Sequence, residues 1–504
     1  MVHIKLDPSI VKPLHEANPM MMSYNVEFTE VTGGTFWKEF TPGQIAGTEP
    51  FQLDLSSGDF MEIQKGMMQY YPPVDLYNSR IRKLAKAFGP AWIRVSGTWA
   101  TKTYYDFEDT GVVPEGYQNR MTKQQWLNIL DFVDAVGGKL LISVANCEGL
   151  HSAQEPWNPS QAEKIFALSA EYGHPIDAVE FTNEPNIIAI TGFPVGYTAA
   201  DFRRDQDLFH KWVRDNYPGT LIVGPCSTDS NAIKMGPNSG SSKGGAGIAD
   251  VMECCTTDEL MEGCTEKLEV FSYHYYNGIS ERLEAVMPDA HWQPEQATSE
   301  EYLAMAGMCA KAFSPLRDKY VPGGEMWVTE SGDAGGGGDT WASTYLDVFR
   351  TLNEFGSFCT VTDGVIFHNT LASSDYGYLQ HGTFEPRPNY FAVLLWTRLM
   401  GQTVFASGEE IREGAHVYAH SRKDGKDGYA YLVINNSNET TTVELPKEAT
   451  AYVLEGKDGL RSRVMTLNGR DLVLGENDEL PCLCGKAVEG KLEVPAMSCA
   501  FVVI

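Results

Sequence analysis

Residues 178–186 read AVEFTNEPN, and this stretch is the best guide to the fold. An apolar run passes into a polar cluster, and Pro185 ends the strand pattern. A buried parallel strand has this composition where it delivers side chains to the mouth of a barrel. A second run, residues 326–332 (MWVTESG), also carries a glutamate at its end. Alone, the Asn-Glu-Pro tripeptide fits a simple turn, but two such strand ends favour a carboxylate pair, Glu184 and Glu330, facing one cavity.

Strand patterns recur along most of the chain. Runs with strand character begin near residues 21, 91, 139, 178, 220, 268, 325 and 362. Helical spacing separates most of them; residues 124–136, for example, place apolar side chains on one face and end before Gly137-Gly138. Strands and helices alternating in this number predict an α/β fold, a (β/α)₈ TIM barrel over residues 21–400. Because such barrels usually have ~250 residues, we expect insertions, including a Ser/Gly-rich loop over residues 228–247.

The pattern changes after Gly401. Short alternating runs follow one another, separated by turns such as Asn468-Gly469, and no helical spacing is evident. This predicts an antiparallel β-sandwich over residues 401–504. Residues 2–6 alternate in the same way, so the N-terminal segment is expected to form a strand that joins another sheet.

The composition argues against several classes of partner. The chain has 504 residues, of which 43% are hydrophobic and 21% charged, as in a folded globular protein. A formal net charge of −28, with no basic run to offset it, disfavours nucleic acid and anionic membranes as partners. No segment approaches the ~18 continuous apolar residues of a membrane span.

The N-terminus and the cysteines bear on the compartment. Residues 1–9 lack the apolar segment of a signal peptide, so we expect a cytoplasmic protein unless a leader was removed. Ten cysteines are too few for a disulfide scaffold of this length. Gly-rich phosphate loops and histidines paired at metal-ligand spacing are missing, and no nucleophile elbow stands between a strand and a helix, since the one G-x-S-x-G match, residues 240–244, lies in the Ser/Gly-rich stretch. We therefore expect no metal, no cofactor and no serine nucleophile. The sequence does not indicate which oligomeric state the protein adopts.

The polar strand ends indicate a reaction class. Two carboxylates across a pocket that binds polyols suit glycoside hydrolysis, in which one protonates the leaving oxygen and the other attacks the anomeric carbon. Asn183 could hold the sugar 2-hydroxyl, and a tyrosine of the sixth strand could orient Glu330. Two other interpretations stay open: a simple ion pair between Glu27 and Arg94, and a structural histidine at position 274 whose hydrogen bonds are satisfied at the barrel mouth. A non-catalytic carbohydrate-binding protein on the same barrel is the alternative from another class.

Four stretches carry a resemblance to a known family. Residues 182–186 (TNEPN) look like the acid/base motif of the large clan of retaining (β/α)₈ glycosidases. Residues 93–98 (IRVSGT), 273–278 (YHYYNG) and 389–401 resemble the second strand, the sixth strand and the exit helix of glycoside hydrolase family 79, which contains heparanases and β-glucuronidases. The family's sandwich borrows an N-terminal strand, which implies a second domain of residues 1–20 plus 401–504.

The resemblance assigns roles to individual residues. It implies that Glu184 is the acid/base and Glu330 the nucleophile. The family binds the sugar carboxylate through backbone N–H groups of a glycine run and through a tyrosine, which match Gly336, Gly337 and Tyr376 here. The remaining expected substrate contacts are Glu27, Thr98, Asn183 and Tyr276.

The chain also departs from the family pattern. Residues 372–375 read ASSD where an Ala-Gly-Asn-like sequence is usual, so Asp375 is expected to put negative charge near the carboxylate pocket. Gly335 replaces an aromatic residue. Because no basic heparin-binding cluster is evident, we expect an exo-β-D-glucuronidase acting on small glycosides or oligosaccharide ends rather than an endo-acting heparanase. A retaining glycosidase for a neutral glucoside, xyloside or galactoside is the alternative.

Overall fold

Eight parallel strands close into a barrel in the computed structural model, which describes residues 2–53, 56, 60–228, 235–238, 249 and 253–504. Each strand lies where the sequence predicted one, so the TIM-barrel prediction is confirmed. Most of the predicted loop at residues 228–247 lies outside the described residues. The strands are β3 (Met22–Glu27), β6 (Trp92–Ser96), β9 (Lys139–Ile142), β10 (Ala178–Val179), β11 (Leu221–Ser227), β12 (Val270–Ile279), β13 (Met326–Gly335) and β14 (Ile366–His368).

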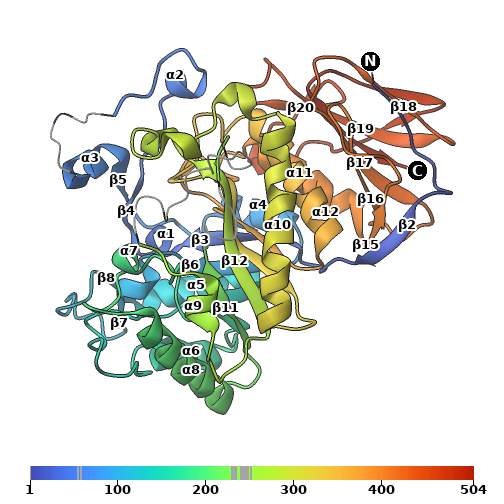
Figure 1. Ribbon diagram of the computed structural model, residues 1–504. Helices are drawn as coiled ribbons and strands as arrows, with labels where there is room; N and C mark the ends of the chain where they lie inside the picture. Colours follow the sequence, from blue (N-terminus) through green and yellow to red (C-terminus); the bar gives the residue numbers. More distant parts are fainter. Residues whose placement is uncertain (1, 54–55, 57–59, 229–234, 239–248, 250–252) are drawn as a thin grey trace.

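Helices surround the barrel (Figure 1). Local sequence sets their ends: Thr122 and Gln125 form a capping box at the start of α5, and Gly137 ends that helix in a left-handed conformation. Helix α10 packs on the barrel through buried side chains that extend as far as Phe313. Among the described residues, no helix has the length and apolar composition needed to cross a membrane. The longer helices are α4 (Ser79–Ala87), α5 (Lys123–Val136), α6 (Ala162–Tyr172), α8 (Ala199–Asn216), α10 (Glu300–Tyr320), α11 (Leu346–Val361) and α12 (Pro388–Leu399).

Shorter elements decorate the mouth and flanks of the barrel. Two pairs of strands form small separate sheets, β4 with β5 and β7 with β8. The elements are α1 (Phe28–Thr32), β4 (Gly34–Trp37), α2 (Pro42–Ile45), α3 (Phe60–Met67), β5 (Met68–Tyr71), β7 (Thr103–Asp106), β8 (Asn119–Thr122), α7 (Ile188–Thr191), α9 (Thr257–Met261) and the 3₁₀ turn η3 (Glu281–Leu283).

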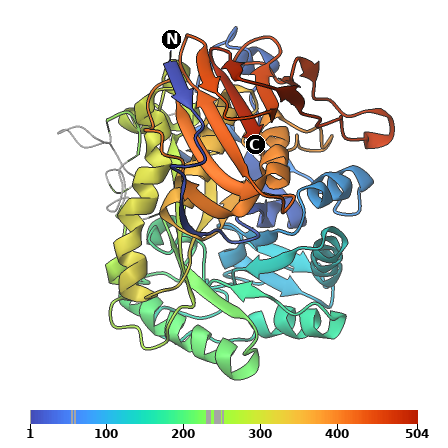
Figure 2. The ribbon, with the colours of Figure 1, turned by 90° about the vertical axis from the view of Figure 1, so that its right-hand side faces the viewer.

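The C-terminal part consists of two further sheets. Strands from the extreme N-terminus join both of them, β1 parallel to β18 and β2 antiparallel to β15, as Figure 2 shows for the blue segment beside the orange strands. The boundaries at residues 20 and 400 stay a prediction. The nine-stranded sheet holds β2 (Lys12–Glu16), β15 (Met400–Ala406), β16 (His416–Arg422), β17 (Tyr429–Asn435), β24 (Ser498–Val503), β19 (Ala449–Gly456), β20 (Met465–Leu467), β21 (Arg470–Asp471) and β22 (Lys486–Val488). The three-stranded sheet holds β1 (Val2–Lys5), β18 (Thr441–Glu444) and β23 (Lys491–Val494).

An apolar cluster fills the amino-terminal end of the barrel. Side chains from the beginnings of the strands meet there, and the rings of Trp92 and Trp327 lie 4.9 Å apart between centroids. Phe367 stacks against Trp327 from the last strand. This cluster closes one end of the barrel, and the opposite end, at the carboxyl ends of the strands, is where barrel enzymes place their active sites.

Candidate active site

Glu184 and Glu330 meet at the carboxyl end of the barrel. Carboxylate oxygens of both residues and a ring nitrogen of His274 all lie within 4.8 Å of one another. Glu184 follows β10 with a φ of +46°, a left-handed conformation that is unfavourable for a residue with a side chain. Its backbone N–H donates to the carbonyl of Cys226, 3.2 Å away. Strained backbone of this kind is concentrated at functional sites.

Arg94 is the buried centre of the cluster. From β6 its guanidinium donates to Glu180 at 2.8 Å, to Glu330 at 3.0 Å and to the side-chain oxygen of Asn183 at 2.7 Å. Among the described residues no ion pair joins Arg94 to Glu27, so the simple pairing considered from the sequence is absent. Because Arg94 holds the oxygen of Asn183, the amide nitrogen is the end that remains to donate to a ligand.

Two side chains of β12 complete the surroundings of the glutamates. His274 Nδ1 lies 3.0 Å from Glu184 Oε1 and 3.5 Å from Glu330 Oε2, while its Nε2 lies 2.9 Å from the thiol of Cys226. The hydroxyl of Tyr276 donates to Glu330 Oε2 at 2.8 Å. Asn369, at the end of β14, donates in turn to the Tyr276 hydroxyl at 3.0 Å. Glu330 is therefore contacted from two strands, β6 through Arg94 and β12 through His274 and Tyr276, and Asn369 fixes the Tyr276 hydroxyl from behind.

These contacts favour an ionised Glu330. Burial raises the pKa of Glu330, but the charges of His274 and Arg94 and the Tyr276 hydrogen bond outweigh burial and bring it below its ordinary value. Burial lowers the pKa of His274, yet the neighbouring Cys226 and Glu330 and the hydrogen bond to Glu184 raise it well above the ordinary value. The side chain of Glu184 is more open than that of Glu330, at 20% against 7% exposed.

Glu27 belongs to the same cluster, and its surroundings favour the protonated form of its carboxyl group. Burial, followed by repulsion from Glu330, raises its pKa well above the ordinary value although Arg94 acts in the opposite direction. Its carboxyl packs directly on Gly97, where a Cβ would lie 2.0 Å from Glu27 Oε2. Only glycine fits there, and it also has a φ of +103°. Thr98 follows Gly97 and is partly exposed.

The glycine run forms a second wall of the site. Gly336, Gly337 and Gly338 have φ values of +96°, +94° and +82°, which is the left-handed region that favours glycine. The carbonyl of Gly337 accepts from the Ser374 hydroxyl at 2.9 Å. The Tyr376 ring stacks on Tyr276 with 6.4 Å between centroids, so this wall adjoins the one that holds Glu330.

Asp375 does not carry an unbalanced charge, contrary to the expectation from its sequence position. Its carboxylate accepts from the buried guanidinium of Arg282 at 2.7 Å and from the backbone N–H of Phe40 at 3.2 Å. Both charged side chains are at most 2% exposed. The negative charge is therefore balanced inside the wall rather than presented to a ligand.

Four members of the site were missed from the sequence: Glu180, Cys226, Arg282 and Asn369. Glu180 had a signal, because the period of two in a strand places it on the same inner face as Ala178, which lies in the barrel interior. Asn369 directly follows the last barrel strand, and this position was its signal. Cys226 and Arg282 had no local signal, since their importance depends on partners far away in the sequence.

Glu184, His274 and Glu330 form the one group in the described part of the chain whose ligand atoms could converge on a metal ion. Arg94 donates directly to Glu330, and a cation would have to compete with that guanidinium. The arrangement therefore suits two working carboxylates better than a metal site.

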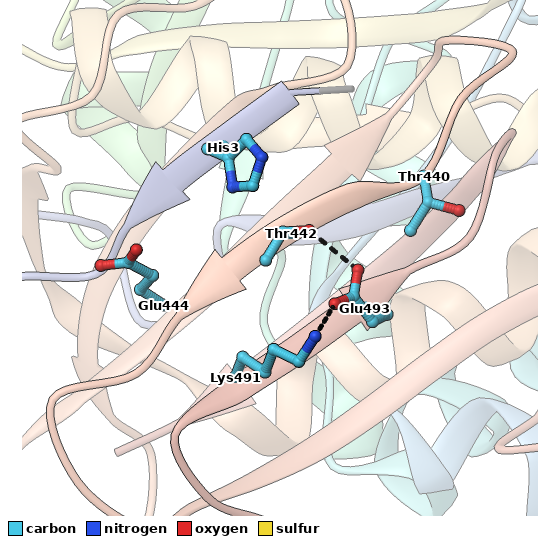
Figure 3. Close-up of a pocket in the computed structure, with 6 residues that line it drawn as sticks. All are labelled: His3, Thr440, Thr442, Glu444, Lys491 and Glu493. Carbon is cyan, nitrogen blue, oxygen red and sulfur yellow. Dashed lines mark hydrogen bonds and ion pairs between the residues drawn. The ribbon is translucent and has the colours of Figure 1, made fainter.

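A separate hollow lies on the outer face of the three-stranded sheet. Figure 3 shows it between His3 of β1, Thr442 of β18 and Lys491 of β23. Lys491 and Thr442 both bind Glu493, so the charges there are already paired. Neither Glu184 nor Glu330 lines this hollow. The chemistry indicated by the sequence is located at the barrel mouth.

Comparisons with known proteins identify relatives of the whole chain. No protein-family model matches the chain. Heparanase-like protein 1 of Arabidopsis thaliana is 24% identical over 489 residues, covering 86% of this chain and 85% of its own. Baicalin-β-D-glucuronidase of Scutellaria baicalensis is 25% identical over 476 residues, covering 85% and 83%.

A solved structure shares the fold. The 4-O-α-L-rhamnosyl-β-D-glucuronidase from Fusarium oxysporum aligns with a TM-score of 0.60 and 14% identity over 100% of both chains. At this identity the likeness shows the fold alone. Taken with the curated relatives, which include heparanases and glucuronidases of glycoside hydrolase family 79, the fold identifies the chain as a TIM-barrel glycoside hydrolase.

Proposed function

We propose that the protein is a retaining exo-β-D-glucuronidase that removes glucuronate from small β-glucuronides or oligosaccharide ends. The homologues support the coarser statement, a glycosidase acting on glucuronides or heparan sulfate. One observation carries the retaining mechanism: oxygens of Glu184 and Glu330 approach within 4.8 Å. Retaining enzymes place their carboxyl groups about 5–5.5 Å apart, whereas inverting enzymes leave about 6.5–9.5 Å for a water molecule.

In the first step Glu330 attacks the anomeric carbon. Its ionised state, favoured by Arg94 and by the Tyr276 hydrogen bond, supplies the electron pair for the new carbon–oxygen bond. As the glycosidic bond breaks, Glu184 gives its proton to the leaving oxygen, and the aglycone departs as an alcohol or phenol. The product is a glycosyl ester on Glu330.

In the second step water hydrolyses that ester. Glu184, now a carboxylate, takes a proton from the water while the water oxygen attacks the anomeric carbon. Glu330 leaves as a carboxylate, and the two displacements together retain the β-configuration. Asn183, whose oxygen is fixed by Arg94, is positioned to donate its amide N–H to the sugar 2-hydroxyl.

Neutral donors support a uronic acid in the pocket. Among the described residues, the backbone N–H groups of Gly337 and Tyr376 have no acceptor. Successive N–H groups in turn conformations make anion-binding concavities, so these two groups suit the sugar carboxylate. The remaining substrate contacts that we propose are Glu27, whose pKa burial and Glu330 raise, together with Thr98, Tyr276 and Gly336.

A panel of 4-nitrophenyl β-glycosides tests the proposal. We expect turnover of the glucuronide to exceed that of the glucoside, galactoside and xyloside, with the β-glucuronic acid anomer released first in a proton NMR time course. Preference for a neutral sugar would replace the uronate assignment but keep the catalytic pair. Binding of these glycosides without turnover of any of them would instead support a carbohydrate-binding protein.

A further inference from the structure

Arg282 is a fully buried arginine that contacts backbone carbonyls rather than a substrate pocket. It lies in η3, and its Nη1 atom donates to Gly338 O at 2.7 Å and to Gly336 O at 3.3 Å. Its Nη2 atom donates to Asp375 at 2.7 Å. The guanidinium also lies 3.7 Å from the centroid of the Phe40 ring. Burying an ion pair is unfavourable unless the geometry is excellent, so this arrangement calls for a reason.

The peptide geometry of the glycine run gives a reason for burying the Arg282–Asp375 pair. In a trans peptide the C=O of one residue and the N–H of the next point in opposite directions. Arg282 draws the carbonyl of Gly336 to one side, which turns the N–H of Gly337 to the other. The carbonyl of Gly337 is fixed separately, by the backbone N–H of Asp375 at 3.2 Å. The carbonyls of Gly336 and Gly337 therefore each accept a hydrogen bond. The N–H of Gly337 has no acceptor among the described residues.

We propose that Arg282, locked by Asp375, is a positioning residue for the substrate carboxylate: it aims the N–H of Gly337 at the bound anion. This inference rests on the proposed glucuronidase function and adds the residues that set its sugar specificity. Arg282 acts through the loop and does not touch the sugar. Its charge is balanced by Asp375, so the wall presents peptide dipoles rather than a cation to the ligand.

The chemistry of the pair explains the residue types. A guanidinium has five donors in a rigid fork, which can reach two carbonyls and a carboxylate together. Lysine has three donors at one point and cannot span the same acceptors. Asp375 is doubly suited, because its side chain fixes Arg282 while its own N–H fixes the Gly337 carbonyl.

The test compares two substrates that differ only in the carboxylate. In the full-length enzyme, Arg282→Lys should raise KM for 4-nitrophenyl β-D-glucuronide by about tenfold, the size expected for losing one hydrogen bond to the substrate. KM for the matched β-D-glucoside should change little, so the ratio of the two kcat/KM values falls. Asp375→Asn should move the ratio in the same direction but less, since an amide oxygen still accepts from Arg282.

Arg350→Lys is the matched control. Arg350 is another buried arginine, but it binds Asp347 and Glu354 and no carbonyl of the glycine run. Its replacement should lower the melting temperature without changing the substrate ratio. If Arg282→Lys does not fold, Asp375→Asn carries the test, with melting temperature and the glucuronate inhibition constant as further measurements.

The outcomes separate the two proposals. An unchanged ratio in Arg282→Lys and Asp375→Asn, or equal losses on both substrates, would overturn the role of Arg282 while leaving a glucuronidase. A wild-type enzyme that prefers the glucoside would overturn the glucuronidase assignment and this inference with it. A selective loss on the glucuronide together with weaker inhibition by free glucuronate, but not by glucose, is the supporting result.

Discussion

Two buried arginines lie beside the proposed sugar pocket and are used in opposite ways. Arg94 donates directly to Glu330, and its charge helps to keep the pKa of that carboxylate low. Arg282 is neutralised by Asp375 and contacts carbonyls of the glycine run. One arginine sets a protonation state and the other orients a peptide. In a chain of net charge −28, this division would let the proposed site bind an anionic sugar through peptide dipoles, while the charge of Arg94 acts on the nucleophile.

Replacing Glu330 by Gln should have the largest effect, because it removes the proposed nucleophile that Arg94 serves. We expect kcat for an aryl β-glucuronide to fall on the order of 10⁴-fold or more, as for other members of a catalytic group. End-point assays at high enzyme concentration measure the residual activity. Full activity in Glu330→Gln would show that the nucleophile lies elsewhere.

Glu184→Ala should come second and depend on the leaving group. Loss of a general acid costs about 10²–10⁴-fold for a poor leaving group, and less for a dinitrophenol that needs no proton. Added azide should restore turnover of the activated substrate by attacking the glycosyl ester on Glu330. Equal losses for both leaving groups and no azide effect would contradict the acid/base role.

Arg94→Lys should shift the pH dependence of kcat/KM. Arg94 lowers the pKa of Glu330, and the nucleophile must be ionised, so activity falls as pH drops through that pKa. Weakening the interaction raises the pKa, and the acid limb should move to higher pH. Arg282→Lys should leave the acid limb in place. Identical pH profiles for wild type and Arg94→Lys would remove the distinction between the two arginines.

Gly337→Ala should disturb the glycine run that borders the proposed carboxylate pocket and leave the two glutamates unchanged. Gly337 has a φ of +94°, and an added Cβ would lie 2.5 Å from the Cβ of Trp37. The loop must then move, so kcat/KM for the glucuronide should fall about tenfold relative to the glucoside, as for one lost hydrogen bond. A matched loss on both substrates would point to general disruption.

Glu30→Gln should give the smallest effect, on stability rather than activity. Burial raises the pKa of Glu30 to about 8 from the ordinary 4.5, so between these values the folded protein binds more protons than the unfolded chain. Wild-type stability therefore declines as pH rises through this window, and Gln removes the decline. The melting temperature of Glu30→Gln should exceed that of wild type by a few degrees at pH 8 and by less at pH 5. An equal difference at both pH values would contradict the assignment.

The barrel could be predicted from the sequence because its signals are local. Each strand is a short buried run with turns and helices on either side, as in residues 178–184 and 326–332, and the number of such runs identifies the fold. The two glutamates follow from the same pattern, since the rule that active sites lie at the carboxyl ends of barrel strands needs only strand boundaries. Family resemblance then assigned Gly336, Gly337 and Tyr376 to the sugar carboxylate.

Only the tertiary structure decided which charges meet. Arg94 and Glu330 are 236 positions apart, and Arg282 and Asp375 are 93 apart, so no periodicity links them. From the sequence, Asp375 was expected to repel an anionic ligand, and Arg94 was considered as an ion-pair partner for Glu27. The protonation state and the effect of a charged side chain depend on its neighbours and its burial, and both are fixed only when the chain folds. The sequence by itself determined where the two acids stand, and the folded barrel determined how each is held.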